Sequence, residues 1–281
     1  MDIKKLLIRT VSGIIYVAAI VGCILWGEIG VTILGCLLAL IAGFEFIKIC
    51  NADELSHPTP SALDLMGVIL LAFSFNPWIP VIPLIIWLIF MLARLIAQIY
   101  VKEGDSISML SHSMMLQAYI GIPLATMGAL TLFTQPEMIL LVFLMLWIND
   151  TGAYIVGSLL GRHKLFERIS PKKSWEGFIG GLLFNIIAAL IFCYTDLFYF
   201  GLDTGIVQWI IVAVIITVFG TWGDLLESMI KRRLHIKDSG NIIPGHGGIL
   251  DRIDSFLLAM PAFFIYILAY EFFKGYNLFP L

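Results

Sequence analysis

Charged residues are scarce in this sequence. They make up 13% of the chain, whereas hydrophobic residues make up 60%. A soluble globular domain carries about 25% charged and about 45–50% apolar residues. The shortage of charge excludes an ordinary soluble domain, and the excess of apolar residues predicts an all-α polytopic membrane protein.

Cysteine is also rare, and its spacing excludes two kinds of site. The four cysteines are Cys23, Cys36, Cys50 and Cys193, and no C-x-x-C pair occurs. Without paired spacing, neither a disulfide framework nor a zinc site is expected. These side chains are expected to serve as small apolar packing residues.

Several nucleotide-binding and hydrolase motifs are missing as well. The P-loop pattern G-x-x-x-x-G-K-[ST] does not occur, and residues 157–164 are only a near miss in its glycine spacing. The patterns G-x-S-x-G and H-E-x-x-H are absent too. The basic, apolar N-terminus lacks a small-residue cleavage site before Gly27, so we expect a retained first membrane helix rather than a signal peptide.

Long apolar runs are what the sequence has in abundance. A helix that crosses the hydrocarbon core of a membrane needs about 20 mostly apolar residues. Nine candidate runs are present, of which the third is the weakest because it is short. They cover roughly residues 10–27, 30–49, 61–76, 78–99, 113–133, 136–159, 177–199, 205–223 and 255–273.

The basic residues test this count through the positive-inside rule. Nine spans place the N-terminus in the cytoplasm and the C-terminus outside, where Lys274 is the only basic residue of the connections. The basic residues on the cytoplasmic side are Lys4, Lys5, Arg9, Lys48, Lys102, Arg162, Lys164, Arg168, Lys172, Lys173, Lys231, Arg232, Arg233, Lys237 and Arg252. Arg94 falls inside the fourth run. We therefore expect one membrane domain, residues 1–281, whose long connections 160–176 and 224–254 face the cytoplasm.

An aspartate stands in the inner half of the sixth run, within the segment N-D-T-G-A-Y. This residue, Asp150, shares a helix face with Tyr154, four positions later. An acid at that depth indicates a functional site. A buried aspartate that only holds helices together through hydrogen bonds is the alternative.

The segment S-P-K-K-S-W-E-G leads into the seventh run. Ser170 and Pro171 predict a turn, and Ser174 is expected to help start the next helix. Lys172 and Lys173 then lie at a helix entrance, where their positive charge opposes the helix dipole. This placement suggests an anionic partner, with simple anchoring to anionic headgroups as the alternative.

A dense polar stretch follows the eighth run. Asp224, Glu227, Ser228 and Lys231 are spaced 0, 3, 4 and 7. On a helix this spacing forms one polar stripe that continues the eighth span to its cytoplasmic end. Arg232 adds further positive charge there.

A glycine-rich turn, P-G-H-G-G at residues 244–248, precedes the ninth run. Adjacent glycines let backbone N–H groups converge on an anion. Asp251 and Asp254 are three apart and share a helix face just beyond the turn, while Lys237 and Arg252 flank it with positive charge. Mg²⁺ typically takes one or two carboxylates and completes its shell with water and substrate phosphates. The stretch therefore predicts a metal-assisted phosphate site. A plain solvated loop is the alternative, but such a loop would need neither the H-G-G turn nor two pairs of acids at helical spacing.

Residues 228–254 resemble, without a gap, the signature of the phosphatidate cytidylyltransferase (CDP-diacylglycerol synthase) family. That signature runs S-x-[apolar]-K-R-x4-K-D-x-[small]-x2-[apolar]-[P/G]-x-H-G-G-[apolar]-x-D-R-[apolar]-D. Its fixed positions are met by Ser228, Lys231, Arg232, Lys237, Asp238, Gly240, Ile243, Pro244, His246, Gly247, Gly248, Asp251, Arg252 and Asp254. The N-D-T-G-A-Y and S-P-K-K-S-W-E-G segments also look like that family's. The resemblance covers residues 145–260, and residues 1–110 match in hydropathy only.

The resemblance implies that CTP and phosphatidic acid react to give CDP-diacylglycerol and pyrophosphate. It implies Mg²⁺ held by Asp224 and Asp251, with a second, monovalent cation such as K⁺ nearby. It also implies a homodimer in the bacterial inner membrane, with N-terminal helices in 1–110 and catalytic helices in 111–281. Membrane lipids, but no nucleic acid, are the other expected partners.

The residues themselves suggest how such a reaction proceeds. A lipid phosphate oxygen is already anionic and needs little help from a base, so in-line attack on the α-phosphorus depends on positioning and charge. The residues expected to share the phosphate charge are Lys172, Lys173, Lys231, Arg232, Lys237 and Arg252. His246, Gly247 and Gly248 are expected to form a phosphate-binding turn and Ser228 to bind substrate. Asp150, Asp238 and Asp254 are candidates either to support the metal ligands or to hold the second cation, and Asp150 and Asp254 are also candidates for substrate binding.

Three rival classes stay open on the sequence. A secondary transporter for an anionic solute would use Asp150 and Arg94, but it predicts internal repeats, which the sequence does not show. A different lipid nucleotidyl- or phosphotransferase is the second, although the CDP-alcohol phosphotransferase pattern D-G-x2-A-R is absent. A non-catalytic membrane scaffold that keeps its charges as anchors is the third.

Overall fold

The computed structural model describes residues 3–51, 61–76, 78–79, 81–195, 198, 205–245 and 247–273. The chain is predominantly helical and divides into two compact units. Unit 1 comprises Met1–Glu137 and Met229–Asp254, and unit 2 comprises Met138–Ser228 and Ser255–Leu281.

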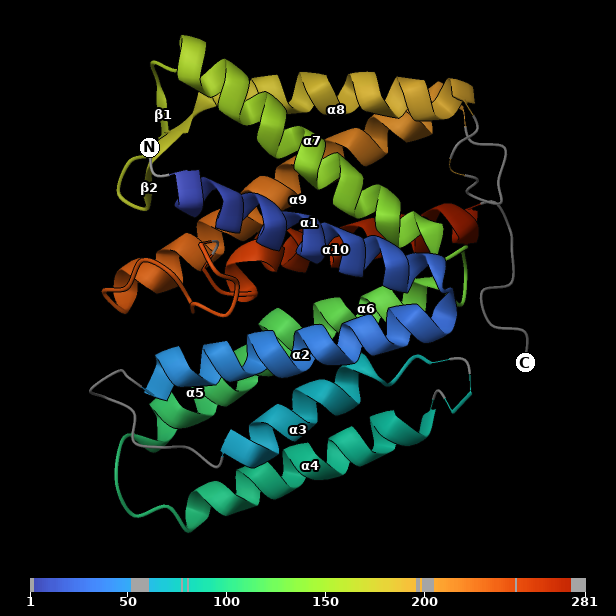
Figure 1. The fold of residues 1–281 in the computed structure, drawn as a ribbon. Coiled ribbons are helices and arrows are strands. Elements are labelled where there is room, and N and C mark those ends of the chain that lie inside the picture. The colour runs from blue at the N-terminus through green and yellow to red at the C-terminus, as the bar shows by residue number, and fades with distance from the viewer. Residues whose placement is uncertain are drawn as a thin grey trace. The chain divides into compact units, whose positions relative to one another are not determined.

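Unit 1 is built mainly from the N-terminal helices. These are α1 (Ile3–Leu25), α2 (Glu28–Asn51), α3 (Ser61–Ala72), α4 (Val81–Ile99), α5 (Ser106–Leu116), a π-helical turn η1 (Gln117–Gly121) and α6 (Ile122–Leu130). Helix α2 packs against α1, α3 and α6, and α3 packs against α4 (Figure 1). The buried side chains of α2 explain its central place, because they lie on several sides of the helix rather than in one stripe.

Unit 2 contains most of the remaining elements. They are α7 (Glu137–Leu160), the strands β1 (Lys164–Phe166) and β2 (Ser170–Ser174), α8 (Trp175–Thr195), α9 (Ile206–Arg233) and α10 (Leu250–Phe273). The last turns of α9 and the first of α10 belong to unit 1. In the core of unit 2, the rings of Phe143 and Phe256 stack with their centroids 4.4 Å apart.

Eight helices of the described chain are long and apolar enough to cross a membrane, and α3 is a shorter apolar helix. The structure therefore confirms a helical, polytopic membrane protein. Each of the nine predicted runs overlaps one of these segments, with α5, η1 and α6 forming a single stretch. Lys274, the basic residue expected outside, is beyond the described residues.

Two local predictions had different outcomes. The polar stripe from Asp224 to Lys231 is helical, as its spacing predicted, because α9 continues to Arg233. The turn predicted at Ser170 and Pro171 was wrong. These two residues begin β2, which pairs with β1 in an antiparallel hairpin, and the turn lies at 167–169. Because Ser170 pairs with Phe166 across the hairpin, the backbone at Ser170 is an extended strand rather than a turn.

Arg94, the charge inside an apolar run, has an internal partner in unit 1. Its Nε lies 3.0 Å from Oδ1 of Asp64, and its Nη1 donates to the side chain of Gln98 at 2.9 Å. Both charged residues are buried. Gln117, the first residue of η1, donates to the backbone carbonyl of Asp64 at 2.9 Å and accepts from the indole of Trp87 at 3.0 Å. This network ties α3, α4 and η1 together. Arg94 therefore has a structural role, and its presence in an apolar helix does not require a transported solute.

Candidate functional site

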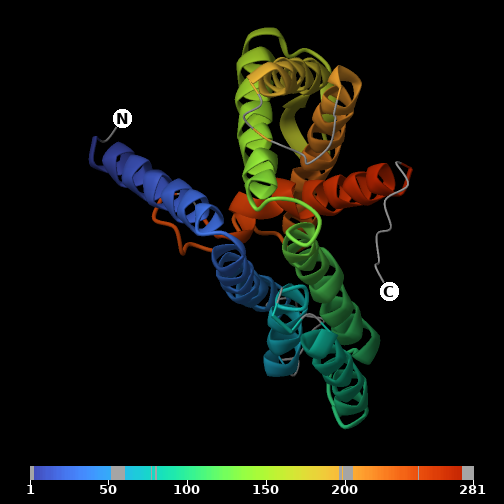
Figure 2. The same ribbon diagram turned by 90° about the vertical axis from the view of Figure 1, so that its right-hand side faces the viewer.

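A cavity of about 440 Å³ lies inside unit 2, among α7, the hairpin, α8 and α9. Figure 2 shows the hairpin (yellow) between α7 (yellow-green) and α9 (orange). The residues that line the cavity are Asn149, Asp150, Ala153, Tyr154, Gly157, Ser158, Leu165, Lys172, Lys173, Ser174, Gly177, Phe178, Thr221 and Asp224. The cavity thus brings together the two motif segments N-D-T-G-A-Y and S-P-K-K-S-W-E-G.

An ion pair between Lys173 and Asp224 forms one wall of this cavity. Lys173 Nζ lies 2.7 Å from Asp224 Oδ2, and Ser228 Oγ donates to the other carboxylate oxygen at 3.2 Å. The Lys173 side chain is 26% exposed and the Asp224 side chain 34% exposed. A pair that is only half-buried holds its geometry yet stays within reach of a ligand in the cavity.

Asp150 and Tyr154 line the same cavity, as their spacing on one helix face predicted, and Lys172 faces it from β2. Asn149 was not singled out from the sequence, although it is the first residue of N-D-T-G-A-Y. It is buried, and an added Cβ on Gly181 would collide with its side-chain oxygen. The cavity therefore presents both signs of charge together with an amide.

Hydrogen bonds at the start of α8 fix the strand that carries the two lysines. Ser174 Oγ accepts the backbone N–H of Gly177 at 3.1 Å, which is an N-cap and confirms the predicted helix start. Glu176 accepts the backbone N–H of Arg162 at 3.1 Å and pairs with the ring of His163 at 2.6 Å. Both ends of the hairpin are therefore tied to the first turn of α8.

Glycines let α7 and α8 approach closely beside the cavity. A Cβ added to Gly177 would lie 3.0 Å from the carbonyl oxygen of Ala153 and 3.3 Å from Cα of Gly157. Small residues at such crossings are typical of membrane helices, because they let backbones pack without side chains between them.

A second cluster of motif residues lies within unit 1. Lys231 Nζ is 2.7 Å from Asp251 Oδ1, and both side chains are nearly buried, at 12% and 6% exposed. The backbone N–H groups of Ser239 and Gly248 donate to Asp251 Oδ2 at 2.9 and 2.8 Å. Asp251 is thus held from three directions at the first turn of α10.

The glycine turn next to this cluster needs glycine at two positions. Gly245 and Gly247 have φ angles of 77° and 82°, in the left-handed region that side chains disfavour. The N–H of Ile243 donates to the carbonyl of Gly247 at 3.0 Å and closes the turn. His246, the expected phosphate-turn histidine, lies outside the described residues.

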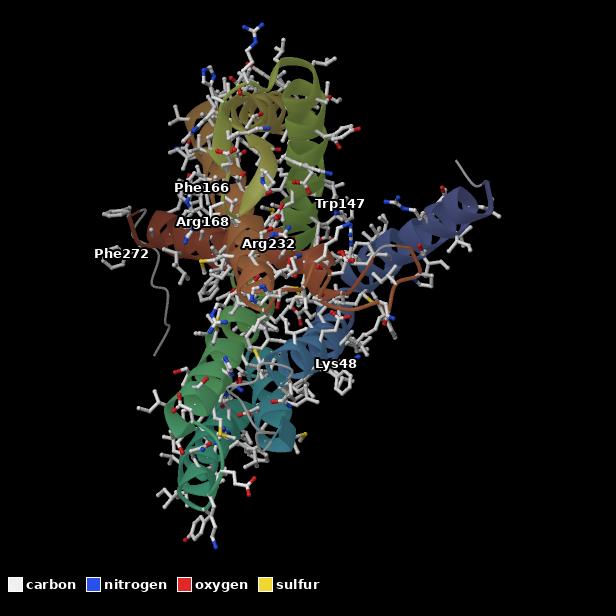
Figure 3. All side chains as sticks on the ribbon, turned by 90° about the vertical axis from the view of Figure 1, so that its left-hand side faces the viewer. Lys48, Trp147, Phe166, Arg168, Arg232 and Phe272 are labelled. Carbon is white, nitrogen blue, oxygen red and sulfur yellow. The ribbon has the colours of Figure 1, made fainter. Side chains whose placement is uncertain are left out.

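The remaining predicted residues of unit 1 lie in the last turn of α9, in the connection that follows it and in the first turns of α10. Arg232 (labelled in Figure 3), Lys237, Asp238 and Arg252 are exposed, and Asp254 is half-buried. The hydroxyl of Tyr16 in α1 donates to the backbone carbonyl of Arg252 at 3.2 Å. Three of the exposed side chains, Arg232, Lys237 and Arg252, are basic.

One residue of unit 1 was missed entirely. Glu45 in α2 is buried and contacts the turn and the start of α10. A lone acid within an apolar helix was the signal that could have marked it, because such a charge is costly unless it has partners.

The chemistry of the two predicted Mg²⁺ ligands fits a hard cation. Asp224 in unit 2 and Asp251 in unit 1 both offer carboxylate oxygens, the donors that Mg²⁺ prefers. Each carboxylate is held against a lysine ammonium at 2.7 Å in its own unit. Each is therefore already arranged to face positive charge.

Comparison with known proteins identifies relatives over nearly the full chain. Residues 7–270 match the cytidylyltransferase family. A phosphatidate cytidylyltransferase of Staphylococcus haemolyticus is 37% identical over 254 residues, which cover 90% of this chain and 96% of the relative. A protein of the same name from Staphylococcus aureus is 37% identical over 261 residues, and one from Staphylococcus saprophyticus is 36% identical, both with the same coverage.

Proposed function

The chain belongs to the cytidylyltransferase family, and we propose that it is a phosphatidate cytidylyltransferase, which converts CTP and phosphatidic acid into CDP-diacylglycerol and pyrophosphate. The observation that carries this proposal is the extent of the match. Relatives of that name align over 90% of this chain and 96% of their own length. The gap-free signature at 228–254 falls inside the matched region.

The reaction is a nucleotidyl transfer. A phosphate oxygen of phosphatidic acid attacks the α-phosphorus of CTP in line, the bond from that phosphorus to the bridging oxygen of the β-phosphate breaks, and pyrophosphate leaves. Because the attacking oxygen is already anionic, no side chain has to remove a proton. The enzyme's contribution is therefore positioning and stabilisation of phosphate charge.

The basic residues of both units supply that charge in this proposal. Lys172 and Lys173 line the cavity of unit 2, and Asp224 fixes the ammonium of Lys173 at 2.7 Å. In unit 1, Lys231 is held by Asp251. The other proposed phosphate-binding residues are Arg232, Lys237 and Arg252, together with the turn at His246, Gly247 and Gly248, while Ser228 is a proposed substrate contact.

Asp224 and Asp251 are the proposed Mg²⁺ ligands. Held by these two carboxylates, Mg²⁺ would supply positive charge that offsets the negative charge of the CTP phosphates and of the departing pyrophosphate. A second, monovalent cation such as K⁺ is part of the proposal, with Asp150, Asp238 and Asp254 as candidate ligands. Titrating each cation against product formation tests both roles.

The proposed topology has nine spans, with α3 as the short one, and an active site on the cytoplasmic face of a bacterial inner membrane. The distribution of basic residues supports it. A reporter fused to the C-terminus should report an external position; a cytoplasmic signal would remove one span from the count.

The proposal has two further parts: each chain forms a single membrane domain, and two chains form a homodimer. The family resemblance supports the dimer. Light scattering on the detergent-solubilised protein should give twice the 31.4 kDa mass of one chain, and a mass of one chain would contradict it.

One assay separates this function from its rivals. Purified protein in detergent is incubated with labelled CTP, phosphatidic acid and Mg²⁺, and a CDP-lipid product is expected. Replacing phosphatidic acid with diacylglycerol, which lacks the attacking phosphate, should abolish the product. A transporter or a scaffold predicts no CDP-lipid in either reaction.

A further inference from the structure

Glu45 is a buried acid in an apolar helix. It lies near the C-terminal end of α2, and only 2% of its surface is exposed. Burying a carboxylate is costly unless hydrogen bonds compensate for the lost water. Its partners should therefore reveal why the chain keeps an acid there.

The carboxylate of Glu45 accepts hydrogen bonds at the start of α10. The backbone N–H of Ile249 donates to Oε1 at 3.2 Å, and the N–H of Leu250 donates to Oε2 at 2.9 Å. The first N–H groups of a helix have no partner within the helix, and a negative charge is favourable there. Glu45 thus acts as a cap that a distant helix supplies.

The same carboxylate also reaches the other end of the connection. Ser239 Oγ donates to Oε2 of Glu45 at 3.4 Å. Glu45 therefore bonds to both ends of this connection, at residue 239 and at residues 249–250. We call residues 239–250, of which the structure describes all but His246, the clamped loop.

Two glycines of the signature leave room for this contact. A Cβ added to Gly240 would lie 2.9 Å from Cδ of Glu45 and closer still to Oε1, and one added to Gly248 would lie 2.5 Å from Oε2. Neither glycine has a left-handed φ. Larger residues are excluded at Gly240 by the space that Glu45 occupies, and at Gly248 by Glu45 together with the Ser239 hydroxyl, rather than by an unusual backbone angle.

The clamped loop in turn orients Asp251. The N–H groups of Ser239 and Gly248 both donate to Asp251 Oδ2, and Oδ1 pairs with Lys231. Glu45 holds Ser239 directly, and it holds Gly248 through the adjoining Ile249. Any shift of the Glu45 side chain therefore moves the donors that fix Asp251.

We propose that Glu45 is a positioning residue for the cytidylyltransferase reaction: it clamps the loop 239–250 so that Asp251 and Lys231 are held in one arrangement. This inference rests on the proposed function. Glu45 contacts the loop, and it acts on the reaction only through Asp251 and Lys231.

A double-mutant cycle between Glu45 and Gly240 tests the proposal. E45A should lower kcat by about tenfold or more and raise the Mg²⁺ concentration needed for half-maximal rate, because Asp251 loses its fixed donors. G240A alone should have a similar effect, since its Cβ displaces the carboxylate. In the E45A background, G240A should cost less than about twofold, because no carboxylate remains to be displaced. The proposal would be overturned if the loss of kcat in the double variant equalled the product of the losses in E45A and G240A. An E45A enzyme with unchanged kcat and Mg²⁺ dependence would also overturn it.

Conservative and matched variants guard against simple misfolding. E45Q keeps the shape and one acceptor oxygen, so it should retain more activity than E45A at an unchanged thermal midpoint. Glu28, the exposed acid in the first turn of α2, provides the control, and E28A should leave kcat and Mg²⁺ dependence unchanged. If E28A and E45A lose activity equally, a general effect on α2 replaces the proposed clamp.

Hydrogen–deuterium exchange gives a readout independent of catalysis. The amides of Ile249 and Leu250 should exchange faster in E45A than in the wild type, because they lose their acceptor. Unchanged exchange would overturn the clamp even if activity falls. A wild-type protein that makes no CDP-lipid would instead overturn the proposed function, and the exchange data would still decide whether Glu45 clamps the loop.

Discussion

Lys231 Nζ lies 2.7 Å from Asp251 Oδ1, and this ion pair joins the last turns of α9 to the first turn of α10. The two residues are 20 positions apart and enclose the whole glycine-rich turn. Because both side chains are nearly buried, replacing either one removes the opposite charge that the other faces, and such losses are costly.

Asp251→Asn should lower kcat by at least about 100-fold while the protein still inserts into the membrane. The amide has a single acceptor oxygen, so it cannot accept from Lys231 and from both backbone donors, and it is a poor Mg²⁺ ligand. CDP-lipid formation measures the loss. Near-normal turnover by this variant and by Asp224→Asn would refute the metal assignment.

Lys173→Met should raise the KM for CTP and lower kcat/KM by about 100-fold, because the cavity loses a phosphate-binding charge and Asp224 loses its partner. Lys164 lies on the neighbouring strand, is exposed and is not among the residues that line the cavity, so K164M serves as the control and should behave as the wild type. Equal effects of the two substitutions would show that only the net charge of the hairpin matters.

Gly177→Ala should destabilise the protein by about 1–3 kcal/mol, because the added methyl group pushes α8 away from the Ala153 carbonyl in α7. The thermal midpoint in detergent reports the change. Gly22 in α1 has nothing within 4 Å of an added Cβ, so G22A should leave the midpoint unchanged or slightly higher. A stable G177A protein would mean that the crossing tolerates a larger residue.

Arg94→Ala should destabilise unit 1 by about 3–5 kcal/mol, because it leaves Asp64 charged and buried without its partner. Removing both charges in the double variant D64L/R94M should cost less than R94A alone. Arg168 on the hairpin turn is exposed (Figure 3), and R168A provides the surface control. If Arg94 served to bind an anionic solute instead, removing the charge at position 64 as well would not restore any of the free energy of unfolding lost in R94A.

Hydropathy located the helices well and their ends poorly. The sixth predicted run, 136–159, nearly coincides with α7, since a membrane helix must be apolar along its length. The eighth apolar run ends at 223, where polar residues begin, and it was the helical spacing from Asp224 to Lys231 that predicted the continuation of α9, which ends at Arg233. Backbone hydrogen bonding does not stop at the membrane surface, so composition alone marks where the lipid ends rather than where the helix ends.

Other features had no local signal. The hairpin at 164–174 is short and basic, and its strands are fixed by contacts with Glu176 that sequence spacing does not reveal. Residue types in the motif segments indicated phosphate chemistry, and the cavity of unit 2 gathers four of the predicted site residues, namely Asp150, Lys172, Lys173 and Asp224. Glu45 could not be linked to the turn, because it lies 204 positions before Ile249 in the sequence.

That separation has a consequence for biosynthesis. The ribosome completes α2 long before it makes the loop whose N–H groups satisfy Glu45. Until then the nascent chain carries an acid in an apolar helix without its final partners, a state with a high free energy in lipid. Insertion of the last helix therefore relieves a strain that α2 has carried since early translation. A chain truncated before α10 should be recognised as incomplete by membrane proteases, however well its other helices have inserted.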